Sequence, residues 1–137
     1  MPKEIDEETR NVATEIHRIT SLKTAYGSDR FDGIGVSGPF VRVDIGNTEK
    51  KSFSSKVFET RTVILKILDR FYKIHSPVDF GSRLILRSIG IYGDFLIVNQ
   101  NADVVIKSPV AMQTKLLKQH AKEFGILSVF LGKMLIR

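Results

Sequence analysis

Cysteine is absent from this sequence of 137 residues, which excludes disulfide bonds and thiolate-ligated metal sites. The absence suits a reducing compartment such as the cytosol. Histidine is also scarce: His17, His75 and His120 stand far apart, and no two have the short spacing that places metal ligands on one helix face. We therefore predict a protein that holds neither a metal ion nor another cofactor.

Long hydrophobic runs are lacking as well. The longest candidate, residues 126–136, is interrupted by Gly132 and Lys133 and is shorter than the roughly 18–20 apolar residues that span a bilayer. The first ten residues are acidic and polar, unlike a signal peptide. These absences predict a cytoplasmic protein.

The charged residues are unevenly distributed along the chain. Residues 1–49 contain six Lys or Arg and nine Asp or Glu, a net charge of −3, whereas residues 50–137 contain fifteen and six, a net charge of +9. Such asymmetry is typical of proteins that bind nucleic acid, nucleoprotein or an anionic lipid surface. The alternative is that the charge serves solubility alone, because many small basic domains bind no polyanion.

The N-terminal segment, residues 1–29, is predicted to form a helix over 3–26 that ends at Gly27. From Ile5 to Tyr26, positions at alternating four- and three-residue intervals form a heptad stripe with two polar interruptions. This stripe can pack on the domain's own sheet or pair with a second copy of the chain. The residues predicted to carry such self-association are Ile5, Val12, Ile16 and Ile19.

Residues 30–137 are predicted to form a basic α+β core within one domain. Apolar periodicity predicts a helix over 56–74, and Ser108–Pro109 is expected to open another helix that Gly125 breaks. The expected strands cover residues 40–45, 84–91, 95–98 and 104–106, with a buried strand or short helix over 126–136. Helices interspersed with hairpins favour a single α+β domain, with a mostly antiparallel sheet packed against about three helices.

Residues Gly33–Gly38 match the GxGxxG pattern of nucleotide-binding loops. That pattern binds phosphates when a strand precedes it and a helix follows, whereas residues 40–45 alternate as a strand does. We therefore interpret the glycines as a hairpin or loop. The sequence shows neither a nucleophile elbow nor a carboxylate pair, and we predict a non-enzymatic protein without a small-molecule substrate.

Clusters of basic residues form a more coherent pattern. Lys115, Lys118 and Lys122 recur at i, i+3 and i+7 and therefore share one helix face. Phe53 lies in a polar, lysine-containing segment, where it would insert among lipid headgroups, stack on a base, or pack onto the next helix. The residues predicted to bind polyanions are Lys50, Lys51, Lys56, Lys66, Arg70, Lys73, Arg83, Arg87, Lys107, Lys115, Lys118 and Lys122.

Three segments, in order along the chain, resemble the matrix proteins of rhabdoviruses. They are Phe53–Val57 leading into the helix that ends in Leu68–Tyr72, the strand Ile89–Tyr92, and Phe124–Ile126 before a short apolar C-terminus. The resemblance covers residues 40–137. It implies a protein that self-associates, condenses ribonucleoprotein and lies at the inner membrane face or in a virion. The acidic N-terminal helix and the lack of a PPxY motif depart from the family.

Charge and resemblance together predict an assembly protein that forms homo-oligomers and contacts RNA, nucleoprotein or an anionic phospholipid surface. The alternative is a roadblock-like dimeric adaptor, since the predicted order of helix, hairpin, helix, three strands and helix is compatible with that architecture. Such an adaptor would form a stable dimer without affinity for RNA or lipid. An enzyme would need residues that only the fold brings together.

Overall fold

The computed structural model describes residues 3–27, 38–44, 50–76, 82–88 and 95–134. Within these ranges, the side chains of residues 3–6, 50–58, 103, 104 and 106 are not described. The elements in chain order are α1 (Lys3–Thr20), β1 (Lys23–Gly27), β2 (Phe40–Asp44), α2 (Lys50–Ile74), β3 (Leu84–Ser88), β4 (Phe95–Asn99), α4 (Ala102–Lys107) and α5 (Val110–Gly132).

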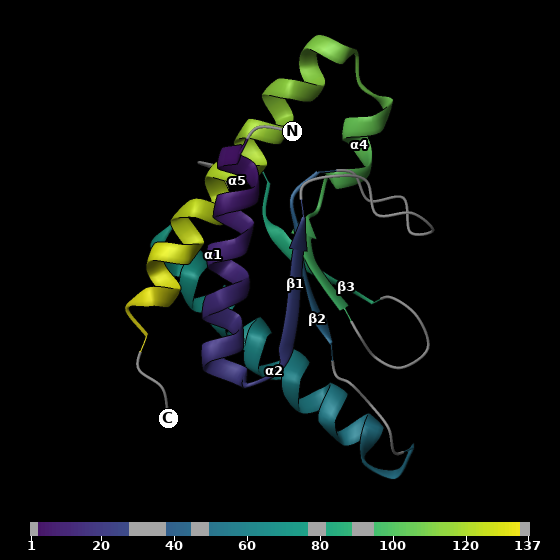
Figure 1. Cartoon of the computed structure of the whole chain (residues 1–137), viewed down its shortest axis with the longest axis vertical. Coiled ribbons are helices and arrows are strands. Elements are labelled where there is room, and N and C mark those ends of the chain that lie inside the picture. The colour runs from purple at the N-terminus through teal and green to yellow at the C-terminus, as the bar shows by residue number, and fades with distance from the viewer. Residues whose placement is uncertain (1–2, 28–37, 45–49, 77–81, 89–94, 135–137) are drawn as a thin grey trace.

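The four strands form one sheet in the order β1-β2-β4-β3, and every neighbouring pair is antiparallel (Figure 1). On β2, Val41 and Val43 are buried, while Phe40, Arg42 and Asp44 are only half-buried. This alternation follows from the two-residue period of a strand, which sends successive side chains to opposite faces. The prediction of an α+β fold with an antiparallel sheet is confirmed.

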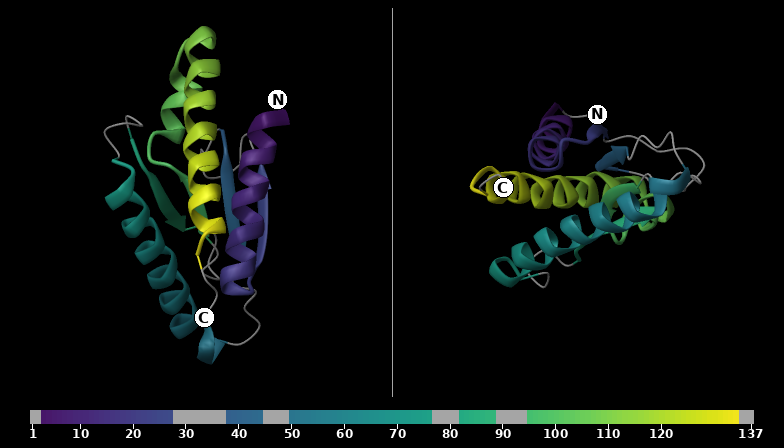
Figure 2. Two further views of the ribbon diagram at one scale, coloured as in Figure 1. Left: turned by 90° about the vertical axis from the view of Figure 1, so that its left-hand side faces the viewer. Right: turned by 90° about the horizontal axis from the view of Figure 1, so that it is seen from below.

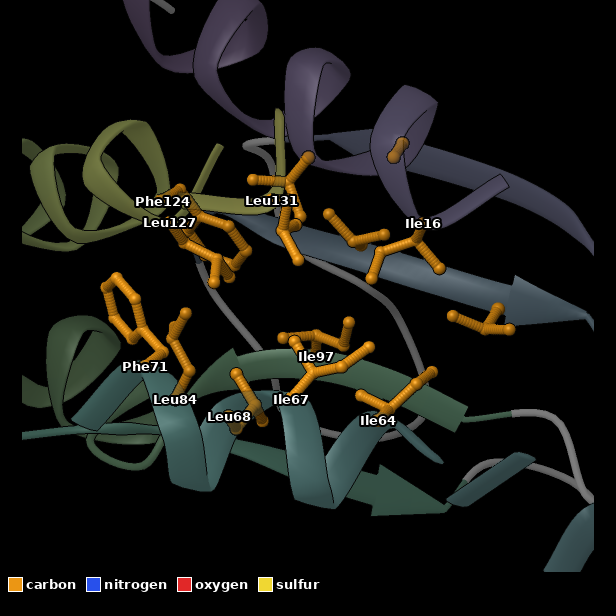
Figure 3. Packing of buried hydrophobic residues seen from close by; sticks show 14 of the residues in the cluster. Ile16, Ile64, Ile67, Leu68, Phe71, Leu84, Ile97, Phe124, Leu127 and Leu131 are labelled. Carbon is orange, nitrogen blue, oxygen red and sulfur yellow. The ribbon is translucent and has the colours of Figure 1, made fainter. Parts of the chain in front are cut away.

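The three long helices lie side by side in one layer, with α5 between α1 and α2 (Figure 2). The core fills the space between this layer and the sheet. In Figure 3, Ile16 of α1, Ile67 of α2 and Leu131 of α5 converge near Ile97 of β4, and all four are buried. Each large apolar side chain buried in this way contributes roughly 1.5–3 kcal/mol before the entropy cost of folding.

The first helix is shorter than predicted. It ends at Thr20, and residues 23–27 are the edge strand β1 rather than further helical turns. Ser21 has a φ of 61°, and its N–H donates to the His17 carbonyl at 2.7 Å, which closes the last turn. The helix prediction failed because Lys23 and Tyr26 continue the heptad spacing, although the chain has already turned.

Two predictions in the C-terminal part are wrong. Residues 104–106 belong to helix α4, not to a strand, because the Asn99 side-chain oxygen accepts the Asn101 N–H at 2.8 Å and turns the chain before them. Gly125 does not end a helix: α5 continues to Gly132. A Cβ at position 125 would lie 2.5 Å from a Glu8 carboxylate oxygen, so this glycine lets α1 approach α5 closely.

The α1 stripe packs inside the chain. Thr9, Val12 and Ile16 are buried, and the Arg18 guanidinium donates to the Leu131 carbonyl of α5 at 2.8 Å. The heptad stripe is therefore explained by packing on the domain's own sheet and helices. The predicted self-association through Val12 and Ile16 is wrong for this fold, because both side chains are already enclosed, and Ile19 is half-buried against the same core.

Residues 33–37 of the glycine motif lie outside the described residues. Gly38 is buried and has a φ of 110°, a backbone conformation that residues other than glycine rarely adopt. A Cβ on Gly38 would lie 2.7 Å from the Leu117 side chain of α5. The last glycine of the motif therefore lies in a bend that packs against α5, two residues before the start of β2.

Candidate polyanion-binding surface

The buried and exposed sides of α5 are sharply separated. His120, Phe124 and Leu127 lie on the buried side, at intervals of three and four residues. Lys115, Lys118 and Lys122 are exposed on the opposite side. None of the three joins an ion pair within the described part of the chain. We call these three residues the α5 lysine strip.

A second set of basic residues lies on α2, next to α5 in the helical layer (Figure 2). Lys66, Arg70 and Lys73 are exposed at i, i+4 and i+7, so they share one face of α2. We call them the α2 basic row. The Lys73 ammonium lies 3.4 Å from the Asp69 carboxylate, an exposed pair that is worth at most about 1 kcal/mol. The α2 basic row is therefore partly neutralised, unlike the α5 lysine strip.

Three further predicted residues lie on other elements. Arg83 precedes β3, and its guanidinium carbon is 4.7 Å from the centre of the Tyr72 ring, a cation–π contact. Arg87 is half-buried on β3, and Lys107 is exposed at the end of α4. Among the predicted cations whose side chains are described, six therefore lie on two neighbouring helices and these three lie elsewhere.

The remaining predicted residues lie outside the described side chains. Lys50, Lys51, Phe53 and Lys56 fall in the first part of α2, and Ile5 falls in the first part of α1. Their predicted contacts with polyanions, lipids or another copy remain predictions.

Helix α1, which packs on the other side of α5, is acidic near its N-terminal end. Glu7 on α1 is exposed, and Glu8 is half-buried against Gly125. Burial raises the pKa of Glu8 above its usual value, and the nearby charge of Glu7 raises it further. The positive field of the helical layer is therefore expected to be strongest on the α2 side of α5.

A buried polar cluster lies between α2, α5 and the sheet, and it joins residues that are far apart in the sequence. The Tyr72 hydroxyl bonds to the Glu123 carboxylate and also accepts the Leu84 N–H at 2.6 Å. The Asn99 amide donates to the other Glu123 oxygen at 3.1 Å and to the Ser82 hydroxyl at 2.6 Å. We call Tyr72, Ser82, Asn99 and Glu123 the buried polar cluster.

Burial dominates the protonation of this cluster. It raises the pKa of Glu123, while hydrogen bonds from Tyr72 and Asn99 oppose that rise by stabilising the carboxylate. The pKa of Tyr72 is also raised, first by burial and then by its bond to Glu123. When Glu123 is ionised, the Tyr72 hydroxyl and the Asn99 amide both donate to its carboxylate. If Glu123 donated a proton to Tyr72, the tyrosine hydroxyl hydrogen would lose its partner.

The cluster does not line the cleft that lies at the C-terminal end of α1. That cleft, of about 280 Å³, lies between the end of α1 and α2 and is lined by Ile19, Thr20, Leu22, Glu59, Thr60 and Val63. A substrate in the cleft would meet none of the groups whose pKa values are perturbed. We assign the buried polar cluster a structural role.

His120 is the second buried titratable group of α5. It is 4% exposed, and its Nδ1 atom has no hydrogen-bond partner among the described atoms. Burial lowers its pKa to about 4. The sequence held a signal for both residues, because His120 and Glu123 continue the apolar period of α5. A helix predicted to end before Gly125 leaves out Leu127 and Leu131, and without them this period is not visible.

Searches for similar proteins give no match to any family model, curated protein or solved structure. The resemblance to rhabdovirus matrix proteins therefore remains a prediction. Among the described residues, no three side chains of the metal-binding types are grouped closely enough to hold a metal ion. No described helix has the length and apolar character needed to cross a membrane.

Proposed function

We propose that this chain is a non-enzymatic binding protein whose α5 lysine strip contacts a polyanion within an assembly of several copies. The observation that carries the proposal is the strip itself: three exposed lysines, which form no ion pair with the described residues, on the side of α5 opposite to its buried face. Seven residues of helix place the outer two about 10 Å apart. Closely spaced cations of this kind displace the counterions that surround a polyanion.

The α2 basic row supports the proposal because it adds cations on the helix that packs beside α5 (Figure 2). The ring centres of Phe71 on α2 and Phe130 on α5 are 5.4 Å apart, so the two helices are in direct contact. A polyanion bound to α5 would therefore also be attracted by the positive charges of the α2 basic row. Such long-range attraction weakens with salt, since the screening length falls to about 8 Å at physiological ionic strength.

Neutralising the strip should weaken polyanion binding without unfolding the domain. The variant K115Q/K118Q/K122Q is expected to bind heparin, RNA or anionic vesicles at least tenfold more weakly, because each surface lysine contributes about 1 kcal/mol to such contacts. The slope of log affinity against log salt should become shallower. Co-sedimentation across a salt series measures both quantities.

The matched control is K115R/K118R/K122R, which keeps the three charges on the same face and should bind as the unmodified chain does. Circular dichroism should be unchanged in both variants, because the three side chains are exposed. Equal affinity of the glutamine variant and the arginine variant would remove the basis of the proposal.

The second candidate is a dimeric protein-interaction adaptor. Among the described strands, β1 and β3 are each paired on one side only, and an unpaired edge is a template for another strand. Exposed apolar residues lie on these edges and on α2, including Tyr26, Leu65 and Ile85. An adaptor should show the mass of a dimer by light scattering at both low and high salt. A dimer with no affinity for RNA or anionic vesicles would favour this candidate over the first.

A further inference from the structure

The N-terminal end of α5 is the most exposed apolar site among the described residues. Val110 is 79% exposed and Met112 is 45% exposed. Pro109 and Ala111 beside them are exposed as well. In Figure 2, this end of α5 rises beyond the ends of α1 and α2. We call residues 109–112 the α5 tip.

The tip is a formed helical turn. The Pro109 carbonyl accepts the N–H groups of Met112 and Gln113 at 2.9 and 3.0 Å. The Gln113 side chain donates to the Ser108 carbonyl at 2.9 Å and fixes the corner between α4 and α5. Because the backbone is already ordered, an apolar surface that received the tip would not have to order it first.

Exposed lysines flank the tip. Lys107 lies three residues before Val110, and Lys115 and Lys118 follow within two turns. An apolar end bordered by cations is the arrangement that interfacial helices use at a membrane: apolar side chains enter the acyl region while lysines meet anionic headgroups.

We infer that the polyanion bound by the α5 lysine strip is the surface of an anionic lipid bilayer, into which the α5 tip inserts Val110 and Met112. This inference rests on the proposed function and names its partner. The chemistry of the tip decides between lipid and nucleic acid. Single-stranded nucleic acid is bound through aromatic side chains that stack on bases. The exposed large apolar side chains of the described residues include one aromatic, Tyr26, and it lies on β1, whereas those of α5 are aliphatic.

The chain contains no tryptophan, so the fluorescence of a single introduced tryptophan reports the polarity around that one residue. In V110W, vesicles of phosphatidylcholine and phosphatidylserine should shift the fluorescence maximum to shorter wavelength, since the indole leaves water. Pure phosphatidylcholine vesicles should cause no shift. The matched control is V129W: Val129 is 59% exposed on the same helix but lies near its other end, and its fluorescence should not change.

A second variant tests the contribution of the tip without adding an aromatic ring. V110S/M112S should bind the phosphatidylserine vesicles about tenfold more weakly, because two aliphatic side chains no longer enter the bilayer. V129S should bind as the unmodified chain does. The binding of single-stranded RNA is measured in parallel on the same proteins.

The outcomes separate the two proposals. Binding to the vesicles with a shift in V110W alone supports the inference. Binding without a shift, an equal shift in V129W, or binding to RNA but not to vesicles overturns the lipid inference and leaves the lysine strip as a polyanion site. Binding to neither partner at low salt overturns the proposed function itself.

Discussion

Replacing Tyr72 with phenylalanine is expected to lower the free energy of unfolding by about 3 kcal/mol, although the change removes a single oxygen atom. That oxygen accepts the Leu84 N–H and bonds to the Glu123 carboxylate. Without it, the buried Leu84 N–H loses its hydroxyl acceptor, and the buried Glu123 carboxylate loses the Tyr72 hydroxyl as a stabilising donor. Leaving a buried neutral group unpaired costs roughly 1–3 kcal/mol, and a charged group costs more.

The matched control is Tyr26→Phe on β1. Tyr26 is 44% exposed, and removing an exposed hydroxyl should change the unfolding free energy by less than about 0.5 kcal/mol. Urea unfolding of both variants, followed by circular dichroism, measures the difference. Similar small losses in the two variants would show that Tyr72 does not hold the buried polar cluster together.

The second prediction with a large effect is a loss of stability at low pH. The stability of the fold is expected to fall by about 3 kcal/mol between pH 6.5 and pH 4 because of His120 alone. Its pKa is lowered from 6.5 to about 4 in the fold, so protons bind the unfolded chain first as the pH falls. The stability that the neutral ring contributes is therefore complete above pH 6.5, and it is lost progressively as the pH approaches 4.

A leucine at position 120 isolates this effect. At pH 7.5, His120→Leu should be nearly as stable as the unmodified chain or more stable, because the Nδ1 atom it removes is buried without a partner. At pH 4.5 the variant should be the more stable protein by most of the 3 kcal/mol. Urea unfolding at the two pH values gives the comparison. A His120 ring that titrates above pH 6 by NMR would contradict it.

The titration of Glu123 changes the unfolding free energy with pH in the direction opposite to that of His120. Its pKa is raised, so the folded state holds its proton more tightly than the unfolded state does. Its contribution to stability is therefore greatest below the unfolded value of 4.5 and decreases as the pH rises through its folded pKa. Both proteins keep Glu123. The difference in unfolding free energy between His120→Leu and the unmodified chain at one pH is therefore almost free of the Glu123 contribution.

The fold class was predictable because the elements that define it have clear periods. The alternation of Phe40–Asp44 is that of a half-buried strand, and the stripe of α2 is that of a helix; both are present. The end of α1 was not predictable in the same way. Lys23 and Tyr26 fit the heptad pattern, but β1 gains its hydrogen bonds from β2, which follows only after residues 28–39 and lies outside the helical pattern. Strand pairing of this kind outweighs local propensity.

The candidate site was predictable in part for a similar reason. The spacing of Lys115, Lys118 and Lys122 within one helix is a local property, so the sequence revealed their common face. The buried polar cluster joins Tyr72, Asn99 and Glu123 across long stretches of chain, and no spacing rule connects them. The exposed tip at Val110 also depends on the fold, since only the positions of α1 and α2 leave that end of α5 uncovered.

The pairing of α1 with α5 bears on the order in which the chain can fold. The bond between Arg18 and the Leu131 carbonyl spans 113 residues, and the buried side of α1 is completed by α5. Contacts so distant in sequence require closure of a long loop before they are formed, which slows folding. During synthesis, β1 and β2 can cover part of the apolar side of α1 soon after it is made, whereas the part that faces α5 stays uncovered until residues 110–132 have followed.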